Sequence, residues 1–192
     1  MATITTAPDG VAPTRSGPTA EETPAWILIA LGVLVAGALA AVCWMSGHVH
    51  ADDTLRTAAR FLHVAAMVVG LGAVLAVDWY AVLWLLGRRR LADILGTATT
   101  LQVPIWAGLT GLIISGLFLH PDLSSPLTRT KLALVLAITV NGLLAHRLAE
   151  RLAPYRDTHP PRPLLARSAT SAAVSQLGWW GACLIGFANS QS

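Results

Sequence analysis

Long uninterrupted apolar stretches alternate with short polar connections along the chain, and this pattern predicts transmembrane helices. A helix that crosses the hydrocarbon core of a bilayer needs about 20 apolar residues. Four stretches reach that length, and a fifth reaches it if its flanking Lys131 and Arg147 extend to opposite membrane surfaces. The predicted helices cover residues of about 25–45, 60–86, 98–120, 131–148 and 169–188. We therefore expect an all-α integral membrane bundle of five transmembrane helices over residues 25–192.

The segment before the first predicted helix has a different character. Residues 1–24 are rich in Thr, Ala and Pro and show no apolar periodicity. Such a composition cannot bury enough apolar surface to fold on its own. We expect a disordered tail there.

The basic residues predict how the helices are oriented, because Lys and Arg accumulate in cytoplasmic loops. Nine of them fall on the side of the N-terminal tail: Arg15, Arg88, Arg89, Arg90, Arg147, Arg151, Arg156, Arg162 and Arg167. Four fall on the other side: Arg56, Arg60, Arg129 and Lys131. This asymmetry places the N-terminus in the cytoplasm and the C-terminus outside.

Composition agrees with a membrane protein and excludes several other classes. Apolar residues make up 54% of the chain and charged residues only 12%, whereas soluble domains carry about 25% charged residues. The net charge is only +3, and the basic residues lie mostly at the ends of the predicted helices. Both features argue against a nucleic-acid partner. Two cysteines in apolar stretches do not make a disulfide framework. The lipid bilayer is the expected partner, and the preference for Arg over Lys suggests a bacterial cytoplasmic (inner) membrane.

A first group of candidate metal ligands lies at the outer end of the first predicted helix. Cys43, Met45, His48 and His50 occur within eight positions of one another. Thiol and thioether groups favour copper(I), and imidazole suits copper, zinc and iron. These side chains are therefore candidate metal ligands. The alternative interpretation is that the histidines simply solvate a polar loop.

A second candidate site involves the second and third predicted helices. His63 and Met67 share one helix face with Gly70, whose missing side chain would let another helix or a flat cofactor approach. His120 ends the third predicted helix at a similar expected depth. Two such histidines can ligate haem iron from both sides, so His63, His120 and Met67 are candidate cofactor-binding residues for haem b. The alternative is that both histidines hydrogen-bond to backbone or water at a helix interface.

Asp78 is the most unusual polar residue within the predicted helices. An ionised carboxylate near the middle of a bilayer costs about 3 kcal/mol, so Asp78 is expected to be protonated or paired inside the bundle. Asn141 and Gln102 are the candidate partners, with His146 as a further one. Asp78 is interpreted either as a proton-relay or cation-path residue, or as a hydrogen-bonded packing residue.

Two segments resemble a known family. Phe61-Leu-His-Val-Ala-Ala66, followed by Gly70-Leu-Gly72, is similar to a histidine helix of copper-resistance D-like and small b-type-cytochrome-like bacterial membrane proteins. Pro126-Leu-Thr-Arg-Thr-Lys131, followed by Asn141-Gly142, resembles a lysine-bearing helix start in the same group. The resemblance implies a helical bundle that handles copper or binds haem, with His63 and Lys131 at the family positions.

Together these features predict a small integral membrane protein with an outward-side haem b or copper site, used in electron transfer or metal handling. Two other functions are open. The chain is either a non-catalytic subunit or assembly partner of a larger membrane complex, or a cation or proton transporter that uses Asp78. A homodimer is compatible with each of them. No catalytic residues are assigned, and the sequence does not establish an enzyme.

Overall fold

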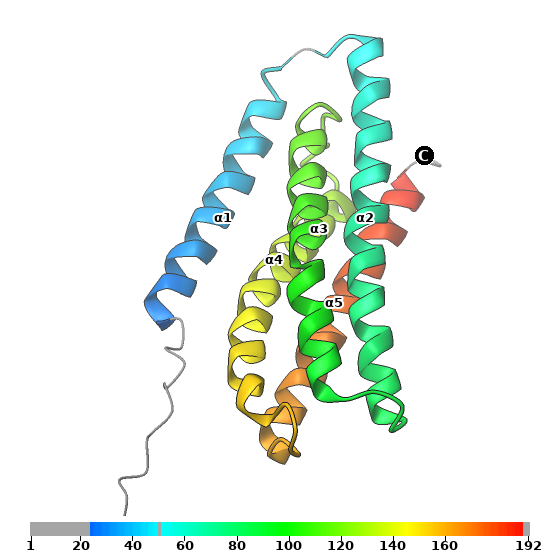
Figure 1. The fold of residues 1–192 in the computed structure, drawn as a ribbon. Helices are drawn as coiled ribbons and strands as arrows, with labels where there is room; N and C mark the ends of the chain where they lie inside the picture. The colour runs from blue at the N-terminus through cyan, green and yellow to red at the C-terminus, as the bar shows by residue number, and fades with distance from the viewer. Residues whose placement is uncertain (1–23, 50, 190–192) are drawn as a thin grey trace, which may run out of the picture.

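The computed structural model describes residues 24–49 and 51–189, and in these ranges the chain is helical. The helices in chain order are α1 (Ala25–Ser46), α2 (Asp53–Leu85), α3 (Leu91–Leu117), α4 (Pro126–Leu152), the short 3-10 helix η1 (Ala153–Tyr155) and α5 (Arg162–Asn189). Consecutive long helices run in opposite directions through one elongated bundle (Figure 1). The expected all-α class is confirmed.

Four helices, α1 to α4, are long and apolar enough to cross a membrane. Many of their large apolar side chains are exposed, such as Leu34 on α1, Val68 on α2 and Val103 on α3. Exposed apolar surface of this extent suits lipid rather than water. The fifth helix is also long, with 28 residues, but it is not among the four helices that are apolar enough to span a membrane by length and composition.

The helices extend beyond the apolar stretches that predicted them. α2 begins at Asp53 and not near residue 60, α3 at Leu91 and not 98, α4 at Pro126 and not 131, and α5 at Arg162 and not 169. A helix continues into the polar interface, where apolarity no longer marks it, until a local signal ends it. For α2 that signal is Asp52, whose side chain accepts a hydrogen bond of 2.7 Å from the amide of Leu55.

The structure also moves the end of the third helix. α3 ends at Leu117, so His120 lies beyond it and not at its last position, as was expected. His120 is exposed and has a positive φ of 46°. A left-handed backbone is incompatible with continuing an α-helix.

The core is built on close helix contacts at glycines. A side-chain carbon at Gly108 of α3 would lie 2.6 Å from the Gly70 Cα of α2, and one at Gly70 would lie 2.6 Å from the ring of Trp179 of α5. On α5, a side-chain carbon at Gly178 would meet Ile138 of α4 at 2.5 Å. Small residues of this kind let membrane helices approach closely. The main contacts join α2 with α3 and α4 with α5, and α1 contributes less, against α3 and α4.

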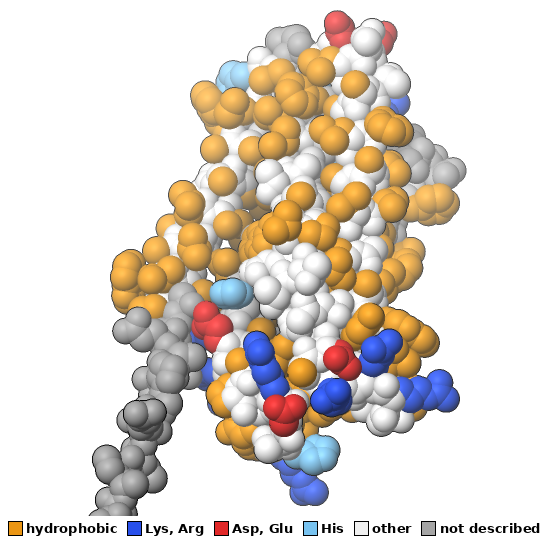
Figure 2. Space-filling model, in the orientation of Figure 1, with side chains coloured by type: hydrophobic (Ala, Val, Ile, Leu, Met, Phe, Trp, Pro, Cys, Tyr) orange, Lys and Arg blue, Asp and Glu red, His pale blue; other side chains and the backbone are white. Residues whose placement is uncertain are grey.

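Charged side chains are distributed unevenly between the two ends of the bundle. The connections α2–α3 and α4–α5 lie at the same end (Figure 1), and Lys and Arg side chains gather there in the face shown in Figure 2. The middle of that face is mostly apolar or uncharged. The arginines of these two connections therefore lie at one end of the bundle, as the alternating direction of the helices requires.

Candidate functional site

His63 lies inside the bundle, ten residues after the start of α2. Its Nδ1 is 2.8 Å from the Oγ of Ser115 on α3, a side chain that is fully buried. The Ser115 hydroxyl donates its proton to the Gly111 carbonyl at 2.6 Å, so its oxygen accepts the second hydrogen bond. This assigns the proton of neutral His63 to Nδ1 and leaves the lone pair on Nε2.

One turn further along α2, Met67 contacts a cysteine from the last helix. The Sγ of Cys183 on α5 lies 3.3 Å from the Sδ of Met67. Cys183 is a free cysteine. A thiol and a thioether thus meet between α2 and α5, on the same α2 face as His63. We refer to His63, Met67 and Cys183 as the outer cluster, a name that means only that they lie toward the end of the bundle with the α1–α2 and α3–α4 connections.

Lys131 from α4 lies beside the outer cluster. Its Nζ is 3.6 Å from the position that a side-chain carbon would take at Gly186 on α5. The lysine acts electrostatically on both His63 and Cys183. Four different helices therefore contribute to this region: α2, α3, α4 and α5.

The outer cluster carries one imidazole, one thioether and one thiol. This donor set suits a soft monovalent ion such as copper(I). It does not suit zinc in a structural site, which takes four ligands drawn from thiolate, imidazole and carboxylate groups. Within residues 24–49 and 51–189, no three His, Cys, Asp or Glu side chains form a metal-binding group.

The other expected metal ligands lie on α1 and in the connection to α2. His48 stacks on Trp44, with ring centroids 4.5 Å apart, and its Nδ1 lies 2.9 Å from the Trp44 carbonyl oxygen. Cys43 is a half-buried free cysteine, and Met45 is exposed. His50 lies outside the described residues. The described members of this group do not converge on one point.

The structure gives His63 and His120 different hydrogen-bond partners. His63 contacts Ser115, and His120 lies five residues after that serine, in the connection between α3 and α4. The Nε2 of His120 is 2.6 Å from the Val49 carbonyl oxygen, so one ring nitrogen is engaged with backbone. Gly70 does not leave room for a flat cofactor either, because Trp179 and α3 occupy that space.

Asp78 has a partner that the sequence did not suggest. Gln176 of α5 donates a hydrogen bond to its carboxylate, and Trp180 donates to the Gln176 side-chain oxygen at 2.9 Å. Asp78 is half-buried. The expectation that Asn141, Gln102 or His146 pairs with Asp78 is therefore wrong. Gln176 interrupts an apolar stretch, and that interruption was the available signal for it.

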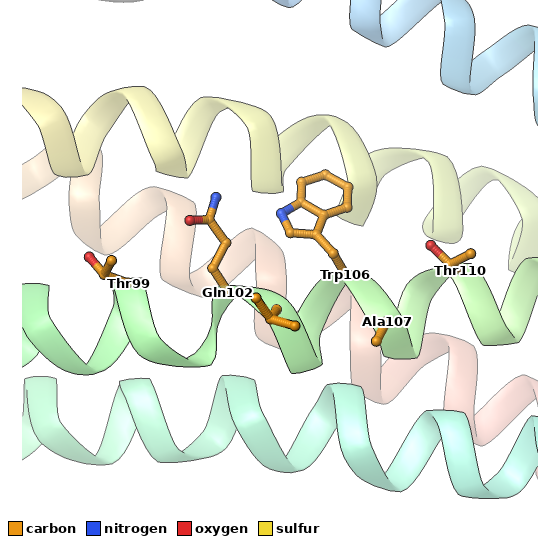
Figure 3. A pocket seen from close by; sticks show the side chains of 6 residues that line it. Thr99, Gln102, Trp106, Ala107 and Thr110 are labelled. Atoms are coloured by element: carbon orange, nitrogen blue, oxygen red, sulfur yellow. The ribbon is translucent and has the colours of Figure 1, made fainter.

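The two other expected partners of Asp78 are engaged elsewhere. Asn141 of α4 donates to the Ser171 carbonyl at 2.9 Å and accepts from the Ser171 hydroxyl at 3.1 Å. Gln102 lies 3.1 Å from His146 Nδ1. Figure 3 shows Gln102 and Trp106 extending from α3 along a surface hollow toward α4. These pairs join α4 to α5 and α3 to α4.

Comparison with protein families, with curated proteins and with solved structures gives no significant match for this chain. The resemblance of the α2 and α4 segments to copper-resistance D-like proteins therefore gains no support from outside the sequence. The chemistry of the outer cluster is inferred from its own donor atoms and geometry.

Proposed function

We propose that this protein binds copper(I) at the outer cluster and serves in copper handling or copper-dependent electron transfer in a bacterial inner membrane. The observation that carries the proposal is the contact of 3.3 Å between the Met67 and Cys183 sulfurs. Two soft donors from different helices meet there, and the imidazole of His63 lies one helical turn away along α2. Copper(I) prefers this combination of ligands.

The proposed topology has five transmembrane helices, with α5 as the fifth. The N-terminus lies in the cytoplasm and the C-terminus outside, because the arginine-rich connections share one end of the bundle. The outer cluster then lies in the outer half of the membrane. Reporter fusions after residues 90, 122 and 160 test this: the first and third reporters are expected in the cytoplasm and the second outside.

The charge beside the cluster favours a monovalent ion. Binding copper(I) to the Cys183 thiolate leaves that pair neutral, whereas copper(II) or zinc(II) would add a positive charge next to Lys131. Like charges repel strongly where water is scarce. Lys131 thus supports selection of copper(I) and of its chemical analogue silver(I) over divalent ions.

Ser115 has the role of an orienting partner in this proposal. Histidine ligands usually donate their second ring nitrogen to a nearby acceptor, which fixes the tautomer and the ring orientation. The hydrogen bond from His63 to Ser115 has this form, and it would leave Nε2 as the ring nitrogen that could hold a copper(I) ion. When copper is bound, the ion supplies a reversible one-electron couple, and the protein holds the donors and limits access of water.

The test is copper(I) binding to the purified protein in detergent, measured by competition with a coloured copper(I) chelator. Met67→Leu and Cys183→Ala each remove a sulfur donor. Each is expected to weaken copper(I) binding by at least about 10- to 100-fold, which is the usual loss when a residue that only orients a metal ligand is removed. Met45→Leu and Cys43→Ala remove the same atoms from α1 and serve as matched controls. If the α1 variants lose affinity and the outer-cluster variants do not, the proposal is wrong.

Spectra and composition of the same preparation separate the other functions. A reducible Soret band that disappears in His63→Ala would establish haem in place of copper. Additional chains that co-purify in fixed ratio would favour a subunit of a larger complex. Ion uptake into vesicles that is abolished by Asp78→Asn would favour a transporter.

A further inference from the structure

A groove opens between α4 and α5 near the arginine-rich end of the bundle. Its volume is about 700 Å³. Arg147 and Arg151, one turn apart on α4, line it together with Arg167 of α5. These three arginines converge on one opening from two different helices. They lie on the side that the topology assigns to the cytoplasm.

The opposite end of the groove is apolar. Val140 and Leu144 of α4 line it together with Val174 of α5. Leu144 is 52% exposed and Val174 is 40% exposed, so this wall faces whatever surrounds the helices. From Ala137 to Arg147 the groove follows α4 for about 15 Å. It therefore runs from the membrane interface into the depth of the hydrocarbon layer.

A hydrogen-bonded pair closes the floor of the groove. The double hydrogen bond between Asn141 and Ser171 ties α4 to α5 at its mid-length. Both residues line the groove. The side chains that are tied in this way hold the two helices at a fixed spacing, so the groove is a lasting feature of the α4–α5 pair.

We propose that this groove binds an anionic glycerophospholipid of the cytoplasmic leaflet. The phosphate contacts the three arginines, and one acyl chain lies along the apolar wall. Guanidinium groups match the geometry of phosphate and form paired hydrogen bonds with it. Basic pockets between membrane helices on the cytoplasmic side are recognised in this way by anionic headgroups.

The residue types that line the groove support an anionic occupant. The lining contains three arginines and no Asp or Glu. A soluble anion would use the arginines alone. A phospholipid also covers the apolar wall, which makes it the better match.

The test is native mass spectrometry of the full-length protein in detergent with added phosphatidylglycerol or phosphatidylcholine. We expect phosphatidylglycerol to remain bound and phosphatidylcholine to bind more weakly. The double variant Arg151→Gln with Arg167→Gln is expected to lower phosphatidylglycerol affinity by about 30-fold. Each basic residue near an anionic membrane surface contributes a factor of about five to six in affinity, and this variant removes two. The single variant Arg167→Gln, at an exposed position, provides a second and milder test.

The matched control removes two arginines from the same end of the bundle but outside the groove. Arg88→Gln with Arg90→Gln in the α2–α3 connection should leave affinity within about threefold. Equal losses in both double variants would mean general surface attraction and would overturn the proposal. Displacement of the lipid by an equal concentration of glycerol 3-phosphate would identify an anion site that needs no acyl chain, which also overturns it. None of these outcomes depends on copper at the outer cluster.

Discussion

The contact between Gly108 and Gly70 allows a sharp test of how α2 and α3 pack. A methyl group at Gly108 would lie 2.6 Å from the Gly70 Cα and 2.7 Å from the Ala66 carbonyl oxygen. Carbon atoms pack best at about 3.5–4.0 Å, so the overlap is close to 1 Å. Both contacted atoms belong to the backbone and cannot rotate away. Gly108→Ala must therefore separate the two helices.

The expected cost of that separation is about 1–3 kcal/mol, the usual range for overpacking, and backbone contact places it at the upper end. Alanine also gains about 0.8–1.0 kcal/mol over glycine from helix propensity. Gly72→Ala on α2 shares this gain, and a side-chain carbon there meets nothing within 4 Å. The difference between the two variants therefore isolates the steric cost.

The assay is thermal unfolding in detergent, followed by helical circular dichroism at one fixed heating rate. Each kcal/mol shifts the midpoint by about 2–4 °C in a protein of this size, so Gly108→Ala should melt about 2–12 °C below Gly72→Ala. The separation also pulls Ser115 away from His63, so copper(I) affinity should fall with stability. Equal melting midpoints in the two variants would refute the close packing of α2 on α3.

Three further predictions concern other polar contacts. Gln176→Leu leaves the half-buried Asp78 without its donor and should cost about 1–3 kcal/mol in the same unfolding assay, whereas adding Asp78→Leu should recover most of that loss. Asn141→Leu should cost about 0.6 kcal/mol and at most about 1.7 kcal/mol, the range for hydrogen bonds between membrane helices; a larger loss would contradict this range. Hydrogen bonds from the amide and hydroxyl of Ser124 hold the pKa of Asp122 below its usual 3.8. These hydrogen bonds therefore persist above pH 3.8 and weaken as the pH falls through the lowered pKa. Amide exchange at Ser124, compared with Asp122→Asn at each pH, measures this, and identical exchange at neutral pH would exclude the contact.

The sequence predicted the presence of the helices well, because the length of an apolar stretch is a property of consecutive residues and does not depend on how the helices pack. Each apolar stretch became a helix, and the alternation of basic connections matched the two ends of the bundle. The predicted positions of the helix ends were less accurate. For example, α2 begins at Asp53, where Asp52 caps the helix, and not where the apolar residues begin. The first turns of α2 to α5 contain polar residues and so do not continue the apolar stretches. The stretches therefore predicted every helix after α1 to be shorter than it is.

The candidate site was predicted only in part. His63 and Met67 were identified because they share a face of one helix. Cys183 and Ser115 were not assigned to that site, because their partners lie on helices far away in the sequence. The depth estimated from the ends of the apolar stretches placed His120 beside His63, whereas α3 ends three residues before His120 and that histidine contacts the Val49 carbonyl oxygen. Gly70 correctly indicated a close approach, but Trp179 and α3 make that approach.

The fifth helix links these observations. Each of three polar or sulfur-bearing side chains on other helices has its partner on α5: Ser171 contacts Asn141, Gln176 contacts Asp78, and Cys183 contacts Met67. Three polar or sulfur-bearing side chains of α5, Ser171, Gln176 and Cys183, thus meet partners on α2 and α4. In the proposed five-helix topology, insertion of α5 is coupled to its docking, because these side chains are costly in lipid until their partners are in place. Since Cys183 arrives with α5, the outer cluster is complete only in the assembled bundle, and copper bound there would stabilise the docked helix by its own binding free energy.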